Sequence, residues 1–276
     1  MSIKTQKLIN RMAAFALVIV WSIIVIIPLT MLVFVALKTP AELAASPFAW
    51  PQDAQWGIFA ETWAKADLGQ ALRNSLIVTV SSLAILVFFG ASAAYPLARR
   101  TRSTPLFYYF LAGIMVPFQL AMLPLYRLMK LFSLINTFQG VIFIYVATSL
   151  PFVIFLYTGF IKGINRELED AAMVDGAGRM RMFWTIIFPL LKPVTATVII
   201  MTGISLWNDF FIALLFLPKR GMRTLQLALF TFVGQYNNDW QPIFAAVILS
   251  ILPMIIVFLL LQKYFIKGIA SGAVKG

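Results

Sequence analysis

Six long apolar runs constrain the fold of this chain more strongly than any other feature of its sequence. A helix needs about 20 mostly apolar residues to cross a bilayer. The runs that reach this length span residues 12–37, 74–98, 104–126, 140–161, 194–217 and 241–263. Because a backbone in lipid must satisfy its own hydrogen bonds, runs of this length favour helices. The sequence therefore predicts an all-α membrane protein, with six transmembrane helices in one domain that covers residues 1–276.

Composition supports a membrane protein and limits its chemistry. Hydrophobic residues make up 61% of the 276 residues, whereas soluble domains contain about 45–50% apolar residues. The chain has no cysteine and no histidine, which removes disulfides, thiolate nucleophiles and the commonest general base and metal ligand. We therefore expect no catalytic site and no metal site in this chain.

The net charge of +12 would suggest nucleic acid as a partner if the protein were soluble. Here most of the charge lies between the apolar runs, so we interpret it as a signal of orientation in the bilayer and expect no nucleic-acid partner. If the N-terminus is cytoplasmic, fourteen of the 22 Lys and Arg residues lie inside and eight lie outside. This bias predicts that both termini are cytoplasmic.

The first apolar run raises the alternative of a cleaved signal peptide, because it follows a basic flank. The apolar core of a signal peptide has about 7–15 residues, and this run is longer. We therefore expect residues 12–37 to remain as a transmembrane helix.

The loop at 162–192 contains a short acidic stretch, "NRELEDAAMVDGAGRMRMF", with four of the ten acidic residues of the chain. Read as a helix, it places Leu168, Ala171, Ala172 and Asp175 on one face, and Gly176 can end the helix in a left-handed conformation. Acidic side chains favour the positive end of a helix dipole, and the first turn holds three: Glu167, Glu169 and Asp170. The stretch predicts a short surface helix, either a docking site for a partner or a solvated connector.

The string "EDAAMVDGAGRMRMFWTIIFPLLKP" closely resembles the signature loop of ABC importer permeases, in which Glu-Ala-Ala, Asp-Gly and Ile-x-x-Pro elements follow at fixed distances. The matching residues are Asp170, Ala171, Ala172, Asp175, Gly176, Ile186 and Pro189. Asp170 stands where the family usually has Glu, which keeps the charge and shortens the side chain by one methylene. The resemblance implies that this loop docks onto an ATPase subunit.

Other strings resemble the carbohydrate-uptake permeases related to the smaller permease subunit of the maltose transporter. They are "VALKTP", "NSLIVT", "AYPLARR", "VPFQLAMLPLYRLMKLFSLINTFQG", "LWNDFFIALLF" and "SGAVKG". The resemblance implies a bundle like that of ABC type I importer permeases in a bacterial inner membrane. Its implied partners are a second permease that completes a heterodimeric pore, two ABC ATPase subunits and an extracytoplasmic sugar-binding protein. This chain has no phosphate-binding loop, so ATP and Mg are expected on the partner subunits and no cofactor is expected here.

Three sets of site residues follow. The resemblance implies ATPase coupling through Glu167, Glu169, Asp170, Ala171, Ala172, Asp175, Gly176 and Pro189. Amides, aromatic rings and the one intramembrane acid suggest a substrate pathway with Trp207, Asn208, Asp209, Gln119 and Tyr126. The external loop resembles a segment that contacts the binding protein, which suggests Gln226, Gln235, Tyr236 and Asn237. An acid at membrane depth is a functional candidate by default, but a structural ion pair or a helix-packing hydrogen bond is an equal alternative for Asp209. Plain packing is the alternative for the other four pathway residues.

Two further functions stay open. The first is an ABC permease for a different solute, such as a sugar phosphate or an amino acid. External basic residues leave room for an anionic sugar derivative, although binding to lipid phosphates explains them equally: Arg127, Lys130, Arg220 and Arg223. The second is a self-sufficient secondary carrier or a membrane enzyme. Both are disfavoured, because the helices lack a chain of ionisable groups and the sequence lacks catalytic His, Cys and paired buried acids.

Overall fold

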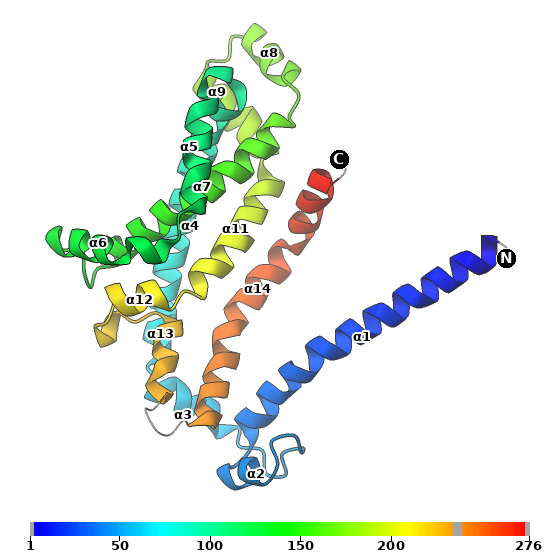
Figure 1. Ribbon diagram of the computed structural model, residues 1–276, viewed down its shortest axis with the longest axis vertical. Coiled ribbons are helices and arrows are strands. Elements are labelled where there is room, and N and C mark those ends of the chain that lie inside the picture. The colour runs from blue at the N-terminus through cyan, green and yellow to red at the C-terminus, as the bar shows by residue number, and fades with distance from the viewer. Residues whose placement is uncertain (1–2, 234–238, 274–276) are drawn as a thin grey trace. The chain divides into compact units, whose positions relative to one another are not determined.

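The computed structural model describes residues 3–233 and 239–273, and the regular elements in these ranges are helices (Figure 1). Four of these helices are long and apolar enough to cross a membrane, and two bent pairs of helices bring the possible total to six. The four long helices are α1 (Ile3–Leu37), α4 (Leu68–Arg99), α7 (Phe138–Lys162) and α14 (Trp240–Ala273). The predicted all-α membrane fold is therefore confirmed. The long helices extend beyond the predicted runs, most of all at the start of α1 and the end of α14.

The run at 104–126 is a single helix in the prediction, and this is wrong. The structure divides it into α5 (Thr104–Met115) and α6 (Phe118–Leu131), which meet at an angle of 95°. Pro117 has no N–H to donate into a helix and pushes the residue before it out of the helical region. Val116 accordingly adopts an extended backbone, with φ −79° and ψ 116°.

The run at 194–217 also differs from the prediction of one helix. The structure ends α11 (Lys192–Trp207) early and resumes with α12 (Phe211–Phe216) after three residues. The apolar residues before α11 are helical as well, and they bend by 70° into it. They form α9 (Arg179–Met182), a π-helical turn η2 (Phe183–Ile187) and α10 (Phe188–Leu190).

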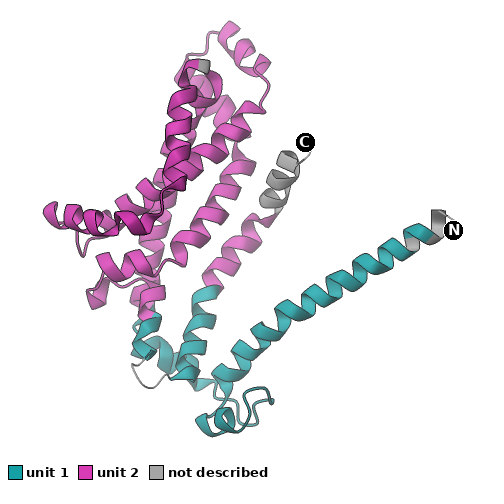
Figure 2. Cartoon of the chain, viewed as in Figure 1, with its two compact units in different colours: residues 1–68, 229–251 teal, residues 69–228, 252–276 magenta. Residues whose placement is uncertain are grey.

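The chain folds into two compact units (Figure 2). Unit 1 comprises residues 1–68 and 229–251, and unit 2 comprises residues 69–228 and 252–276. Unit 1 therefore contains α1, the short helices α2 (Pro40–Ala45) and α3 (Gly57–Lys65), and the start of α14. Unit 2 contains the remaining helices that are described below.

The end of α1 is fixed in unit 1 by a buried lysine. Lys38 is only 1% exposed, and its ammonium group donates to the backbone carbonyls of Ser46 at 2.7 Å and Pro47 at 2.9 Å. Directly after it, Thr39 caps α2 and forms a capping box with Glu42. Most of the apolar side chains of α1 before its last turns are exposed, as expected of a surface that faces lipid or another subunit.

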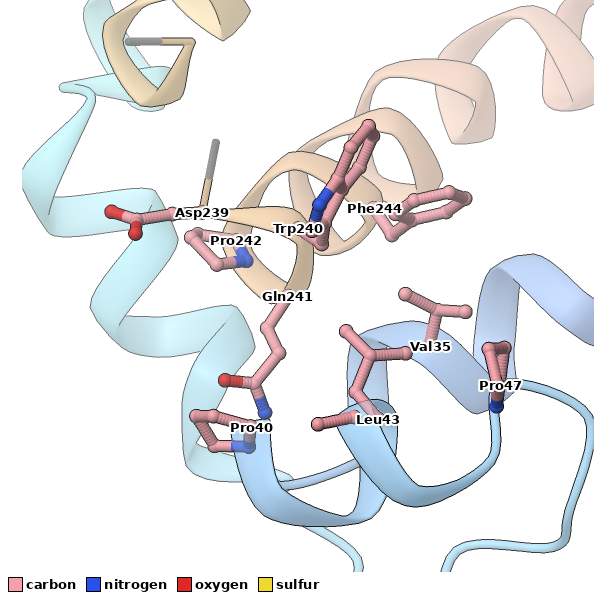
Figure 3. Close-up of a pocket in the computed structure, with 10 residues that line it drawn as sticks. Val35, Pro40, Leu43, Pro47, Asp239, Trp240, Gln241, Pro242 and Phe244 are labelled. Carbon is pink, nitrogen blue, oxygen red and sulfur yellow. The ribbon is translucent and has the colours of Figure 1, made fainter. Parts of the chain in front are cut away.

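Unit 1 also holds a cavity of about 770 Å³ (Figure 3). Residues from the end of α1, from α2 and its flanks, and from the start of α14 line it. Its walls are mostly apolar and include Val35, Leu43, Trp240 and Phe244.

The core of unit 2 forms where α4, α7 and α11 pack together. Gly90 of α4 lies directly against Val153 of α7, and a Cβ at this position would collide with the valine side chain. Small residues allow two membrane helices to approach this closely. The buried Tyr157 of α7 donates its hydroxyl to Thr195 of α11 at 2.9 Å, so a polar contact supplements the apolar core.

Candidate functional site

The acidic stretch forms helix α8 (Glu167–Val174), as predicted. Gly176 follows with φ 78°, a conformation that glycine adopts at little cost. The N–H of Gly176 donates to the carbonyl of Met173 at 3.0 Å, and the N–H of Ala177 donates to that of Ala172 at 2.9 Å. This pair of bonds is the Schellman motif, and it fixes the point at which α8 ends.

The two faces of α8 differ from the predicted pattern. Glu169 and Ala172 are buried against the rest of unit 2, whereas Leu168, Ala171 and Val174 are exposed. The predicted face of Leu168, Ala171, Ala172 and Asp175 is therefore not uniformly exposed, because helix α8 turns its i+3 pair of Glu169 and Ala172 inward. The outer face is partly apolar, and Val174 is 87% exposed.

The buried Glu169 binds the end of α4. Its carboxylate accepts from the hydroxyl of Tyr95 at 2.7 Å and from Nε of Arg99 at 2.6 Å, and Nη2 of Arg99 lies 2.5 Å from it. Both side chains of the ion pair are only 10% exposed. Removal of one partner from such a pair typically costs about 3–5 kcal/mol, because the other charge stays buried.

Two more bonds join α4 to the residues before α8. Arg99 donates from Nη2 to the carbonyl of Ile164 at 3.1 Å, and Arg166 donates from Nη2 to the carbonyl of Arg99 at 3.3 Å. We call this set of contacts, made by Tyr95, Arg99, Ile164, Arg166 and Glu169, the α4–α8 clamp. Sequence reasoning missed Tyr95 and Arg99, although "AYPLARR" contains both.

The rest of the loop also packs on α4. The ring of Trp184 stacks on that of Phe88 with centroids 5.1 Å apart, and Phe183 lies 5.2 Å from Tyr95. A cavity of about 430 Å³ lies beside these rings and the clamp. Pro189 lies in α10 and is exposed. The outward residues Glu167, Asp170 and Asp175 are exposed too, so most of the predicted coupling set is accessible. Its contact with an ATPase stays a prediction.

Asp209 lies at the break between α11 and α12 and caps the second helix. Its Oδ1 accepts from the hydroxyl of Tyr145 at 2.9 Å and from the backbone N–H groups of Ile212 at 2.9 Å and Ala213 at 3.3 Å. Among the described residues it forms no ion pair. The arrangement is that of the structural alternative, a hydrogen-bonded acid at a helix start.

The other pathway candidates separate into two groups. Asn208 accepts through Oδ1 from Nε2 of Gln226 at 3.2 Å, so a pathway candidate meets a binding-protein candidate. Trp207, which precedes Asn208, is buried. Gln119 and Tyr126 lie on α6 and are exposed. Three of the predicted binding-protein contacts lie outside the described residues: Gln235, Tyr236 and Asn237.

The segment that carries Gln226 is attached to the first turns of α4. Asn74 donates from Nδ2 to the carbonyls of Gly221 at 3.0 Å and Arg223 at 2.9 Å. Ser75 accepts through Oγ from the N–H of Leu225 at 2.7 Å, where helix α13 (Leu225–Leu229) begins. We call these contacts the α4–α13 anchor. Asn74 and Ser75 are buried, and sequence reasoning missed their role although it singled out "NSLIVT".

A family of transport proteins matches most of this chain. Residues 86–271 match the family described as "Binding-protein-dependent transport system inner membrane component". The chain belongs to this family. The match covers the end of α4, the loop with α8 and the segment with α13, and it begins after Asn74 and Ser75.

Individual relatives extend over nearly the whole permease. It is 42% identical over 253 residues to the melibiose/raffinose/stachyose import permease protein MelC of Bacillus subtilis, and the match covers 91% of each chain. It is 36% identical to the multiple sugar-binding transport system permease protein MsmG of Streptococcus mutans, over 99% of this chain and all of that one. A crystal structure of a bacterial ABC transporter that imports the acidic polysaccharide alginate matches with a TM-score of 0.81 and 22% identity, over 96% of this chain and 99% of that one. This likeness shows the same fold, and the permease is a multi-pass membrane protein.

Proposed function

We propose that this chain is the permease subunit of an ATP-driven, binding-protein-dependent importer of a sugar or sugar derivative. The observation that carries the proposal is its 42% identity over 91% of its length to a permease named for melibiose, raffinose and stachyose import. Relatives named for sugar import at 34–36% identity support the same class of substrate.

The chain works in this proposal as half of a heterodimeric pore in a bacterial inner membrane, with both termini in the cytoplasm. Two ATPase subunits bind ATP and Mg, and an extracytoplasmic binding protein delivers the sugar. The chain itself then hydrolyses nothing. The excess of Lys and Arg on the side of α8 and the termini supports the orientation.

Helix α8 supplies the docking surface for an ATPase subunit. Its outer face combines exposed acids with the exposed apolar residues Leu168 and Val174. A partly apolar face that remains uncovered in a single chain is typical of a protein–protein contact. The Schellman motif at Gly176 stops the helix after eight residues, so the docking element is short and has a defined end.

Within the proposed class, a specific observation favours an anionic sugar derivative as the substrate. Arg127, Lys130 and Arg220 are exposed, and on the predicted topology they lie outside the membrane. A basic external surface suits an anionic sugar derivative. The structural relative named for alginate import handles an acidic polysaccharide.

Reconstitution tests the proposal. The chain would be purified with its second permease and ATPase subunits, placed in vesicles, and given its binding protein with labelled melibiose or raffinose. We expect uptake that requires both ATP and the binding protein. Uptake without ATP would identify a secondary carrier. ATP-driven uptake of an amino acid and of no sugar would establish the other solute class.

A further inference from the structure

We propose that α4 is the element that carries motion between the docking helix α8 and the outer segment of residues 208–228. Loop 162–192 joins α7 to α11 through the chain, but its side chains bind α4. The proposal rests on the proposed function and adds to it which helix receives the work of the ATPases.

The α4–α8 clamp makes the connection between α4 and the docking helix rigid. The ion pair of Arg99 and Glu169 is buried, and Arg99 also binds Ile164 and, through its own carbonyl, Arg166. Nε and Nη2 of Arg99 both contact Oε1 of Glu169, and the hydroxyl of Tyr95 donates to Oε2, so both carboxylate oxygens are bound to α4. Helix α8 therefore cannot tilt relative to the end of α4 without breaking this pair.

The α4–α13 anchor connects α4 to the outer segment. Asn74 and Ser75 together form three hydrogen bonds to the backbone of residues 221–225. Gln226 follows directly and binds Asn208, which lies at the break between α11 and α12. Both sets of contacts lie on one continuous helix of 32 residues, and the rise from Ser75 to Tyr95 is about 30 Å at 1.5 Å per residue.

The contacts join α4 by side-chain bonds to both segments, in addition to the bond from Tyr145 of α7 to Asp209 and the chain connections of α7 and α11. A helix with side-chain bonds at both of its ends moves both attached segments when it tilts. When a binding protein engages the outer segment, the same helix carries that event to α8. Tyr95, Arg99, Asn74 and Ser75 are thus positioning residues, because they act on docking and on the pore through α4.

The test uses the complete complex in vesicles and compares ATP hydrolysis with and without the sugar-loaded binding protein. The variants Arg99→Ala and Asn74→Ala break the contacts at opposite ends of α4. We expect each to lower the stimulation by the binding protein by about tenfold, while unstimulated hydrolysis stays within about twofold of the parent value. The double variant should lower the stimulation by no more than the stronger single variant does, because either break interrupts the same connection.

Matched controls lie beside each variant. Arg100, directly after α4, and Arg73 on α4 are the exposed neighbours of Arg99 and Asn74, and their alanine variants should keep the full stimulation. Ser75→Ala gives a milder break of the α4–α13 anchor should Asn74→Ala not assemble. Restoration of stimulation by the exchanged pair Arg99→Glu with Glu169→Arg would separate coupling from simple loss of folding.

Three outcomes would overturn the proposal. They are full stimulation in assembled Arg99→Ala and Asn74→Ala complexes, multiplying losses in the double variant, and an assembled exchanged pair that is as defective as its single variants. If the parent complex shows no stimulation by any sugar-loaded binding protein, the proposed function fails instead, so the two failures are distinguishable.

Discussion

Loop 162–192 and the segment 208–228 both attach to α4, but by different chemistry. The loop uses a buried ion pair between Arg99 and Glu169, whereas the segment uses the neutral side chains of Asn74 and Ser75 on backbone groups. The exposed face of α8 remains free for a partner, but the segment buries much of α13, including Leu225 and Leu227.

The difference shows what each region needs. A buried ion pair is costly to break on one side and fixes one geometry, which suits the force transmission that we propose for this loop. Neutral bonds to backbone carbonyls hold a segment without burying a charge. An outer segment held this way keeps its shape with little dependence on the surrounding charges.

The largest expected effect comes from the inner face of α8. Ala172→Asp places a carboxylate where a buried alanine lies, at a cost on the order of 3 kcal/mol. We expect α8 to detach from unit 2 and trypsin to cleave at Arg166 and Arg179 in the purified complex. Ala171→Asp, its exposed neighbour, should leave this protection intact and weaken binding of the ATPase subunits. Equal protease sensitivity of both variants would contradict the assignment of the two faces.

The next largest effect concerns Asp209 in the outer segment, for comparison with the inner face of α8. Asp209→Ala removes an acceptor for three hydrogen bonds, and we expect a loss of about 2–3 kcal/mol, measured as a lower melting temperature of the complex. Asp209→Asn keeps an acceptor oxygen and should lose less than about 1 kcal/mol and retain transport. If the Asn variant stops transport at an unchanged melting temperature, the charge of Asp209 has a direct role in the pathway.

A smaller effect concerns the end of α8. Gly176→Ala forces a residue with a Cβ into φ 78°, which costs about 1 kcal/mol. We expect a slight fall in the melting temperature and faster amide exchange over residues 172–177. Gly178→Ala is a suitable control, because that glycine has an extended backbone and open space around its Cβ position. An equal effect of both changes would argue against the Schellman motif.

The smallest expected effect concerns the protonation of Glu42 in α2 of unit 1. Hydrogen bonds from the backbone of Thr39, then of Gln52 and Asp53, lower the pKa of Glu42 below its ordinary value. A lowered pKa in the folded state means that this contribution to stability is complete above the ordinary pKa and is lost as the pH falls through the folded one.

We therefore expect the melting temperature of the parent protein to fall on acidification below about pH 4.5 by more than that of Glu42→Gln. At neutral pH the variant should be the less stable of the two. Glu61 lies in the same unit on α3 and is exposed, so Glu61→Gln is the matched control. Parallel acid curves for Glu42→Gln and the parent protein would contradict the role of these bonds.

Much of the fold could be predicted because the long apolar runs correspond to the membrane helices. Length and the absence of charge identified the membrane helices, and Gly176 marked the end of α8. The two breaks at residues 116–117 and 208–210 were missed, because each run stays mostly apolar across its break, even with the polar Asn208 and Asp209 in the second. Pro117 was visible, but prolines also occur inside membrane helices: Pro151 lies within α7.

The candidate site was predicted in its position and less well in its orientation. Helical periodicity placed Ala172 on one face with Ala171, but it cannot tell which side of a short helix meets its own chain. The resemblance implied a coupling role for Glu169, and no sequence pattern indicated that its side chain is buried. Its true neighbours, Tyr95 and Arg99, lie about 70 residues earlier, and single-sequence reasoning has no signal for such a distant pair.

The buried Lys38 has a consequence for biogenesis. Its ammonium group needs the carbonyls of Ser46 and Pro47, which are synthesised only eight and nine residues later. The ammonium group at the end of α1 can therefore obtain its hydrogen-bond partners from its own nascent loop, long before α14 leaves the ribosome. We expect this hairpin to be the first part of the protein to mature on the far side of the membrane, and to hold α1 in place while the later helices insert.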